Sequence, residues 1–274
     1  MNILVAGGTG TIGRAVCEEL IAHGIGNVYV LSRDDSKQAA MRIDVPQAIY
    51  RIGDITHVED CMEVCEDVRA QLVVNCAALK HVDACEQNPT FAQRVNHKAA
   101  KVFYRYCRKN GAARFLQVST DKAVEPMSVL GTTKMMAERD LLKRPGVVVV
   151  RFGNVIGSRG SILDVAHRQI AQTGALWVTS EKMMRYWIDV QSAAKFIVDV
   201  LLNGEPHRVH VPQMQERLLV DVLQEKYPGI PVKITHPALG EKIREKLWWD
   251  YEDPKTGVHC CPKEDGGTSR CRVR

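Results

Sequence analysis

The sequence predicts an α/β fold of the Rossmann type, a doubly wound parallel sheet with helices on both faces. Short apolar runs alternate with helix-length amphipathic stretches over the first 150 residues, as in repeated strand–helix–strand units. The apolar runs are continuous rather than alternating, which indicates strands buried on both faces. We expect the strands at residues 3–6, 28–31, 48–52, 72–76, 115–118 and 147–150.

The expected helices lie between these strands, at residues 11–23, 57–70, 89–110 and 128–143. After residue 150 the alternation weakens. A glycine-rich stretch at 153–160 precedes a helix at 161–173 and shorter mixed elements up to about residue 249. We expect one domain over residues 1–150, joined by about 188–205, a smaller C-terminal lobe over 151–252, and a loosely ordered tail over 253–274.

The composition excludes several classes of protein. The 274 residues are 45% hydrophobic and 25% charged, which rules out a disordered, collagen-like or coiled-coil chain. The formal net charge of +5 comes from scattered cations, and only Arg270, Arg272 and Arg274 cluster. A mild excess of this kind suits an anionic small molecule at least as well as nucleic acid. Because basic and aromatic residues do not interleave, we expect no nucleic-acid partner.

The cysteines and the N-terminus predict a cytoplasmic protein. Nine cysteines is an odd number without paired spacing, which indicates reduced, buried thiols. His259, Cys260, Cys261 and Cys271 lack the Cys-x-x-Cys arrangement of a zinc site, so we expect no metal. The chain enters its first strand without a signal peptide, and no apolar run approaches the roughly 18 residues of a membrane span. We therefore expect no membrane partner.

The segment Gly-Gly-Thr-Gly-Thr-Ile-Gly at residues 7–13 follows the first strand and opens the first helix. Glycines there allow a tight turn and a close approach of backbone N–H groups to a pyrophosphate at the helix N-terminus. The strand–turn–helix context therefore predicts a dinucleotide-binding loop. The residues assigned to it are Gly7, Thr9, Gly10, Thr11, Ile12 and Gly13.

The end of the second strand favours NADP over NAD. Ser32 stands where an NAD enzyme usually places a carboxylate for the ribose 2′-hydroxyl, and Arg33 follows at once. A hydroxyl beside a guanidinium suits a 2′-phosphate. We interpret the next two aspartates as a solvated acidic loop capped by Lys37. Asp54, after the third strand, is either an adenine contact or a helix N-cap.

Two polar segments leave the fourth and fifth expected strands, at residues 76–82 and 119–126. In a doubly wound sheet the carboxyl ends of the strands face the ligand crevice. Asp121 and Lys122 are adjacent there and could divide proton donation and proton abstraction, because each group shifts the pKa of the other. The alternative interpretation is a helix-capping aspartate beside a surface lysine.

Several longer motifs together span roughly residues 1–250: GGTGTIG, SRDDSKQ, GDI, CAALKHVDACEQNP, VSTDKAVEP followed by GTTK, RFGNVIGSRGS, VTSEKMMRYW and GEKIREKL. On these motifs the chain resembles the extended short-chain dehydrogenase/reductase superfamily and, within it, the nucleotide-sugar 4,6-dehydratases of polysaccharide biosynthesis, typified by UDP-N-acetylglucosamine 4,6-dehydratases. Members transfer a hydride from sugar C4 to NADP, lose water across C5 and C6, and return the hydride to C6. The resemblance implies a tightly bound NADP, a UDP-hexosamine substrate and a homo-oligomer.

The resemblance also implies roles for individual residues. Asp121 would be the acid that helps the C6 hydroxyl leave, Lys122 the base at C5, Thr120 a partner of the C4 hydroxyl, and Lys134 a contact of the nicotinamide ribose. The other implied cofactor contacts are Ser32, Arg33, Lys37, Asp54, Ile55, Cys76, Ala77, Ala78, Ser119, Val155, Ser158 and Arg159. The implied substrate contacts are Lys80, His81, Asn154, Ile162, Arg185 and Glu241.

The chain departs from the family pattern at two places. Leu130 stands four residues before Lys134, where the superfamily places tyrosine and some dehydratases carry methionine. Ala238 and Leu239 replace the usual Arg-Pro before the Gly-Glu-Lys helix, which we expect to end at two tryptophans that pack or form an interface. The alternative functions are a 5,6-dehydratase or epimerase on the same scaffold, and a non-catalytic NADP-binding regulator. The retained Asp-Lys pair argues against the regulator, which has no need of an acid and a base.

Overall fold

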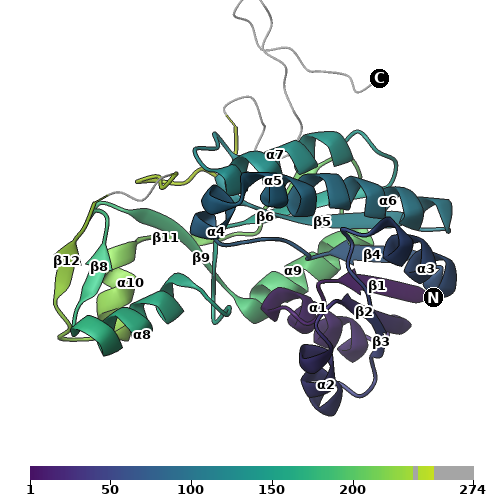
Figure 1. Cartoon of the computed structure of the whole chain (residues 1–274), viewed down its shortest axis with the longest axis horizontal. Helices are drawn as coiled ribbons and strands as arrows, with labels where there is room; N and C mark the ends of the chain where they lie inside the picture. The colour runs from purple at the N-terminus through teal and green to yellow at the C-terminus, as the bar shows by residue number, and fades with distance from the viewer. Residues whose placement is uncertain (237–239, 250–274) are drawn as a thin grey trace, which may run out of the picture.

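The computed structural model describes residues 1–236 and 240–249 and contains a parallel seven-stranded sheet (Figure 1). The strand order is β10-β6-β5-β4-β1-β2-β3, and each neighbouring pair is parallel. The order reverses at β1, which pairs with both β2 and β4, so the expected doubly wound fold is confirmed. The strands are β1 Asn2–Ala6, β2 Asn27–Ser32, β3 Ile49–Ile52, β4 Leu72–Asn75, β5 Arg114–Thr120, β6 Val147–Phe152 and β10 Val209–His210.

Alternate residues of each strand face opposite layers of helices. Ile3 and Val5 of β1 belong to a core shared with α1 Thr11–Ala22, α2 Asp35–Asp44 and α9 Val190–Asn203. Leu4 and Ala6 belong to the core beneath α3 Val58–Val68, α6 Ala100–Lys109 and α7 Val129–Leu141. Both faces of the sheet are therefore buried, which explains the continuously apolar strands.

One expectation about these helices was wrong. Asp34 and Asp35 do not form a loop, because Asp34 is the N-cap of α2 and its side chain accepts from the Lys37 amide at 2.9 Å. The helix expected at 89–110 is present, and it consists of three consecutive helical segments, α5 Pro89–Gln93, the π-helical η1 Arg94–Ala99 and α6. The sequence analysis also missed α4 Val82–Gln87. A short 3₁₀ turn, η2 Asp121–Ala123, follows β5.

The C-terminal part lies to one side of the large sheet (Figure 1). Its three-stranded sheet has the order β11-β9-β7, and β8 and β12 form a separate pair. The elements are β7 Asn154–Ile156, α8 Ile162–Thr173, β8 Leu176–Val178, β9 Met184–Asp189, β11 Gln215–Leu218, α10 Leu219–Lys226 and β12 Val232–Ile234. Before β10, the chain returns to the large sheet through α9, which packs against α1.

The segment 240–249 is not the amphipathic helix that we expected. It runs beside β9, where the Met184 amide donates to the Ile243 carbonyl at 2.8 Å and Arg244 forms an isolated bridge with Met184. Trp248 packs on the core beneath α6 and α7, and Arg139 of α7 stacks over the Trp249 ring. Pairing with a strand thus replaces helical hydrogen bonding in this segment.

Within residues 1–236 and 240–249, no helix combines the length and apolarity that crossing a membrane requires. Six cysteines fall in these ranges and all are free thiols. Five of them are buried as expected, but Cys76 is only half-buried. The tail at 253–274 and its cysteines lie outside the described residues.

A buried ion pair ties the sheet to α7 and to the segment 240–249. Arg151 of β6 is fully buried, and its guanidinium contacts the Glu138 carboxylate at 2.6 Å and 3.2 Å. Arg151 also donates to the Leu247 carbonyl at 2.6 Å. Glu138 is only 3% exposed, so each charge depends on the other in a region that excludes water.

Replacing Arg151 with methionine is expected to lower the free energy of unfolding by about 3–5 kcal/mol, because Glu138 would keep a buried charge without its partner. Urea denaturation followed by circular dichroism measures the change. The double variant Glu138→Leu/Arg151→Met is expected to recover most of the loss. A single variant within about 1 kcal/mol of the wild type would contradict the analysis.

Candidate active site

The loop between β1 and α1 has the geometry of a dinucleotide cradle. Gly7 adopts a φ of 72°, and a Cβ at this position would lie 2.7 Å from the Ala77 backbone nitrogen. A Cβ at Gly13 would lie 2.4 Å from the Gly7 carbonyl oxygen. The N-cap of α1 is Gly10, which supplies no side-chain cap, and the first turn holds no acidic residue. The backbone N–H groups at this helix end suit a phosphate group.

The end of β2 carries the residues expected near the adenosine ribose. Ser32 is buried, and its hydroxyl accepts from the Gln38 amide at 3.1 Å, which leaves the hydroxyl proton available as a donor. Arg33 contacts Asp54 at 3.1 Å while its side chain stays 66% exposed. Lys37 pairs with Asp34. The Arg33 guanidinium therefore lies at the surface beside Ser32 and is already held by a carboxylate.

Asp54 organises the end of β3 and is not an N-cap. Its Oδ1 accepts from the Thr56 amide at 2.9 Å, and the N-cap of α3 is His57. Burial by itself would raise the pKa of Asp54, but the hydrogen bonds from Thr56 and the charge of Arg33 lower it overall. The neighbouring Ile55 is buried in the core.

The loop after β4 is held by a residue that the sequence analysis missed. Asn96, in the π-helical segment, accepts from the Leu79 amide at 2.8 Å and donates to the Leu79 carbonyl at 3.0 Å. It also donates to Thr133 of α7 at 3.1 Å. These bonds fix the backbone just before Lys80 and His81. A π-helical turn often marks a functional position, but the sequence carried no signal for it.

The glycine-rich loop at 153–161 crosses the dinucleotide cradle. The Arg159 amide donates to the Thr11 hydroxyl at 3.1 Å, and its guanidinium donates to the Thr9 carbonyl at 2.7 Å. The Arg159 carbonyl accepts from the Lys80 ammonium. Burial and the Arg159 charge lower the pKa of Lys80. Residues about 150 positions apart in the chain thus meet in one contact.

The three residues expected to carry proton transfer form one hydrogen-bonded group. Asp121 is fully buried, and its Oδ1 accepts from the Thr120 hydroxyl at 2.9 Å and from Lys122 Nζ at 3.2 Å. Asp121 Oδ2 is buried without a hydrogen-bond partner among the described residues. Gly153 lies directly over it, because a Cβ there would come within 3.1 Å of that oxygen. This geometry argues against a surface lysine beside a helix cap.

Lys122 contacts a second carboxylate that the sequence analysis missed. Glu245 Oε1 lies 3.4 Å from Lys122 Nζ, and Glu245 Oε2 lies 2.9 Å from Lys242 Nζ. Burial alone would lower the pKa of Lys122, but Asp121 and Glu245 raise it above its ordinary value. Glu245 stands four residues after Glu241 in the segment that the sequence predicted as a helix, so only the tertiary structure brings it to Lys122.

Lys134 projects from α7 toward β5, where its Nζ donates to the Val118 carbonyl at 3.0 Å. Burial lowers the pKa of Lys134 to about 8. Leu130, one turn earlier, is buried in an apolar cluster with Cys85 and Ala92. The position at which the superfamily carries a tyrosine is therefore part of a packed hydrophobic cluster in this chain.

Arg185 and Glu241 meet as a pair. The Arg185 guanidinium lies 3.4 Å from Glu241 and donates to the backbone carbonyls of Met184 at 2.8 Å and Ile243 at 3.2 Å. Arg185 is only 5% exposed, so a phosphate would compete with bonds that it already makes. Asn154 lies opposite Trp187 on the neighbouring strand β9.

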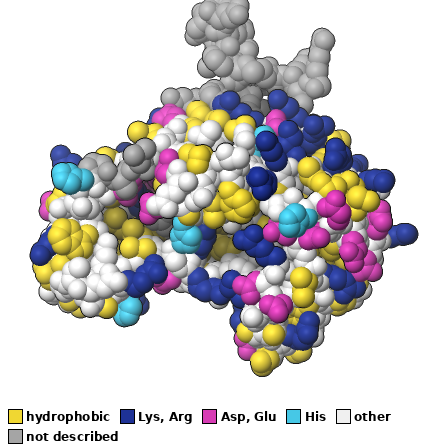
Figure 2. All heavy atoms as spheres, viewed as in Figure 1, with side chains coloured by type: hydrophobic (Ala, Val, Ile, Leu, Met, Phe, Trp, Pro, Cys, Tyr) yellow, Lys and Arg dark blue, Asp and Glu magenta, His cyan; other side chains and the backbone are white. Residues whose placement is uncertain are grey.

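The space-filling view shows the molecule hollowed between α8 and the region of α1 and α2, with Lys, Arg and His side chains around the hollow (Figure 2). One pocket adjoins α8 and the end of α10, close to Ser158 and Ile162. Its lining residues are Ile156, Gly157, Ser161, Leu163, Asp164, His167, Arg168, Lys226 and Tyr227. Neither Asp121 nor Lys122 lines this pocket.

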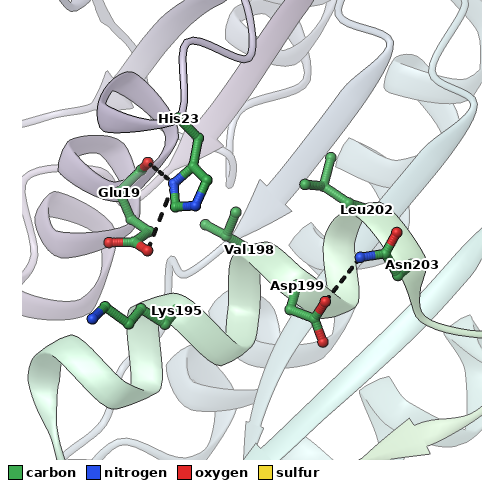
Figure 3. Close-up of a pocket in the computed structure, with 7 residues that line it drawn as sticks. All are labelled: Glu19, His23, Lys195, Val198, Asp199, Leu202 and Asn203. Atoms are coloured by element: carbon green, nitrogen blue, oxygen red, sulfur yellow. Dashed lines mark hydrogen bonds and ion pairs between the residues drawn. The ribbon is translucent and has the colours of Figure 1, made fainter.

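A second pocket lies between α1 and α9 and contains none of the expected site residues (Figure 3). Glu19, His23 and Lys195 line it from these two helices, together with Asp199 and Asn203. His23 and Glu19 lie at the C-terminal end of α1, whereas the cradle is at its N-terminal end. The pocket is therefore separate from the candidate active site.

The remaining expected contacts follow the same strand ends. Cys76 continues β4, where its amide donates to the Ala6 carbonyl at 2.9 Å, and the Ala77 amide donates to Asn75 at 3.2 Å. Ser119 is buried within β5. Val155 is buried in β7, and Ala78 follows in the loop after β4. The structure thus gathers strand ends β1, β2, β4 and β5 with the β6–β7 turn along one edge.

The glycine cradle and the buried Asp121–Lys122 pair lie at one edge of a doubly wound parallel sheet. The chain belongs to the polysaccharide biosynthesis protein family, whose profile matches residues 3–260.

Relatives include both dehydratases and epimerases of nucleotide sugars. The chain is 30% identical over 256 residues to a UDP-N-acetylglucosamine 4,6-dehydratase (inverting) of Campylobacter jejuni, with 89% of this chain and 76% of the relative covered. It is 31% identical over 267 residues to an uncharacterized membrane protein of Methanocaldococcus jannaschii, with 90% and 80% covered. It is 30% identical over 264 residues to a UDP-glucose 4-epimerase of Rickettsia conorii, with 90% and 77% covered.

Solved structures agree with the fold. The X-ray structure of Pen from Bacillus thuringiensis superimposes with a TM-score of 0.83 at 26% identity, covering 90% of this chain and 81% of that one. DesIV, a dTDP-glucose 4,6-dehydratase from Streptomyces venezuelae with NAD and TYD bound, gives a TM-score of 0.80 at 18% identity and covers 97% and 94%. The second likeness establishes the shared fold.

Replacing Gly13 with alanine is expected to weaken dinucleotide binding at least about tenfold, because the new methyl group would overlap the Gly7 carbonyl and displace the cradle. Titration of the cofactor-free protein with NADP and NAD measures the effect. The control is Gly24→Ala near the other end of α1, where nothing lies within 4 Å of the added Cβ and the positive φ of 63° strains only the turn after the helix. Equal affinities in the two variants would refute the assignment of the cradle.

Proposed function

We propose that the protein is an NADP-dependent nucleotide-sugar 4,6-dehydratase that converts a UDP-N-acetylhexosamine, in the first place UDP-N-acetylglucosamine, to a 4-keto-6-deoxy sugar. The observation that carries the proposal is the buried Asp121, hydrogen-bonded to Lys122 at the carboxyl end of β5 and on the same sheet edge as a dinucleotide cradle. A binding-only protein gains nothing from a buried acid beside a base. The similarity to dehydratases of UDP-N-acetylglucosamine supports the choice of substrate.

The residues of the cradle fit a nicotinamide dinucleotide. The pyrophosphate would bind the backbone between Gly7 and Gly13, and Lys134 would hold the nicotinamide ribose. Bound there, the cofactor would supply the acceptor for a hydride from C4 and the donor of that hydride to C6. Residues 1–150 with 188–205 would form the cofactor domain, and residues 151–252 would form the substrate lobe.

The acid and the base share one proton. Transfer of a proton from Lys122 Nζ to Asp121 across their 3.2 Å hydrogen bond gives a neutral carboxylic acid and a neutral amine. In this state Lys122 takes the C5 proton, the C5–H electron pair forms the C5–C6 double bond, and Asp121 protonates the departing C6 hydroxyl as water. Thr120 donates to Asp121 at 2.9 Å and would also contact the C4 hydroxyl.

Epimerisation is the second candidate, because UDP-glucose 4-epimerases are among the relatives. A 5,6-dehydration would use the same C4-keto intermediate and differ only in where the hydride and proton return. Leu130 favours a reaction in which Thr120, Asp121 and Lys122 transfer the alcohol proton, because leucine cannot carry one.

We also propose that the protein is cytoplasmic and forms a homo-oligomer.

Incubation with UDP-N-acetylglucosamine in deuterated water tests the reaction. We expect a 4-keto-6-deoxy sugar that carries deuterium at C5, detected by NMR and formed without added cofactor if NADP co-purifies with the protein. Deuterium exchange at C5 without loss of water would instead indicate a C5 epimerase, and a C4 epimer without deuterium would indicate a 4-epimerase. Absence of all three changes, with NADP and other nucleotide sugars supplied, would refute the enzymatic proposal.

Replacing Asp121 with asparagine is expected to lower the dehydration rate by at least about 100-fold, because asparagine has no proton to give to the leaving hydroxyl. NADP binding should persist. The control is Glu125→Gln, which removes a carboxylate that pairs with Lys246 at the surface a few residues away. Full activity in Asp121→Asn would exclude Asp121 as the acid.

Replacing Arg33 with methionine is expected to lower the affinity for NADP by about tenfold or more and to leave the affinity for NAD unchanged, because only NADP offers a phosphate to the guanidinium. Calorimetric titration of the cofactor-free protein with each dinucleotide measures both. The control is Arg51→Met, an arginine of β3 that pairs with Asp67. An equal loss for NADP and NAD would argue against recognition of the 2′-phosphate by Arg33.

A further inference from the structure

We propose that Glu245 is a positioning residue for Lys122: its carboxylate holds the amine against Asp121 and stabilises the ammonium ion that forms when Lys122 takes the C5 proton. This inference rests on the proposed function, because it concerns the base of that reaction. Glu245 comes from the segment 240–249, more than a hundred residues from Lys122 in the chain.

The geometry places Lys122 between two carboxylates. Asp121 Oδ1 lies 3.2 Å from Lys122 Nζ, and Glu245 Oε1 lies 3.4 Å from it. Asp121 is fully buried and Glu245 is 3% exposed, so water screens neither charge. Opposite charges at these distances confine the amine more strongly than a single carboxylate would.

Glu245 is itself fixed from the far side. Lys242 contacts Glu245 Oε2 at 2.9 Å, and Lys242 Nζ donates to the Val124 carbonyl, just after the 3₁₀ turn, at 2.7 Å. Lys242 therefore joins the segment 240–249 to the turn that carries Asp121 and Lys122. Glu245 is held in place by Lys242 and presents its other oxygen to Lys122.

Among the other groups around Lys122, Arg185 carries a positive charge, which Glu245 offsets. Arg185 of β9 adds a positive charge that opposes protonation of Lys122. Tyr186 of β9 lies on the Asp121 side, where its carbonyl is close to Gly153. On the α7 side, Gly131 meets the Lys122 backbone and brings no charge.

This balance matters most during the reaction. Once Asp121 has given its proton to the leaving hydroxyl and Lys122 has taken the C5 proton, the site holds an aspartate anion and an ammonium ion. Glu245 stabilises the ammonium ion at the same Nζ that Asp121 contacts, without itself gaining or losing a proton. Relative to the neutral Asp121–Lys122 pair, an anion that favours the ammonium product lowers the barrier to transfer of the C5 proton.

The test compares Glu245→Gln with the wild type by kinetics and by NMR of ¹³C-labelled lysine. We expect kcat for dehydration to fall at least about tenfold with little change in KM. We also expect the Lys122 signal, assigned with Lys122→Arg, to titrate at least about one pH unit lower, because one of two neighbouring carboxylates is gone. The NMR titration requires no substrate, so it stands if the proposed reaction fails.

Two further variants separate positioning from structure. Glu216→Gln breaks the exposed bidentate pair with Arg244 in the same segment and should leave the kinetics and the Lys122 titration unchanged. The double variant Lys242→Met/Glu245→Gln removes both members of the buried pair, so it avoids an uncompensated Lys242 if the single variant misfolds. In this double variant we expect the pKa of Lys122 to remain lowered and kcat to remain reduced.

The outcomes are distinct. A Lys122 titration equal to the wild type in the folded double variant would show that Glu245 only neutralises Lys242, and would overturn the inference. A lowered titration with an unchanged kcat would also overturn it, because Glu245 would then not assist the base. Glu245→Gln could lower the pKa of Lys122 while the wild-type protein dehydrates no nucleotide sugar. That result would refute the proposed reaction alone and leave the contact between Glu245 and Lys122 standing.

Discussion

Parallel pairing of strands constrains this protein more than any other interaction, because it delivers the carboxyl end of every strand to the same edge of the sheet. The glycine cradle after β1, Ser32 at the end of β2, the loop after β4 and the Asp121–Lys122 pair after β5 meet there for this reason alone. Because helices cover both faces of the sheet, a side chain in the middle of a strand faces only helices. A ligand can therefore reach the strands only at that edge.

The segment 240–249 connects two groups of buried charge. Its Leu247 carbonyl accepts from Arg151, the sheet residue paired with Glu138 of α7, and its Glu245 reaches Lys122. Stability and the proposed acid–base chemistry therefore both depend on one non-helical segment that lies beside β9. Because buried charges tolerate little displacement, packing of this segment also fixes the spacing of the groups around Lys122.

Local sequence patterns predicted most of the fold and part of the candidate site. Six apolar runs predicted six strands, of which five are mostly buried and the edge strand β3 is only partly buried, and the turn at Gly7–Gly13 predicted a cradle whose glycines are sterically required. The two-residue strand β10 is too short to leave a pattern. Glu245 and Asn96 act through contacts with residues far away in the chain, which no local periodicity encodes. Helix α2 was missed because its N-capping aspartate resembles an acidic loop.

The hydrogen bonds made by Arg159 also affect the order in which ligands would bind and leave. It bonds to Thr9 and Thr11 of the cradle and accepts from Lys80 beside the expected sugar position. A dinucleotide bound in the cradle beneath these bonds would be retained by them, whereas a sugar approaching from the α8 side would not have to disturb them. In the proposed reaction this arrangement would keep the cofactor bound over many turnovers, which suits an oxidation and a reduction that cancel within each cycle.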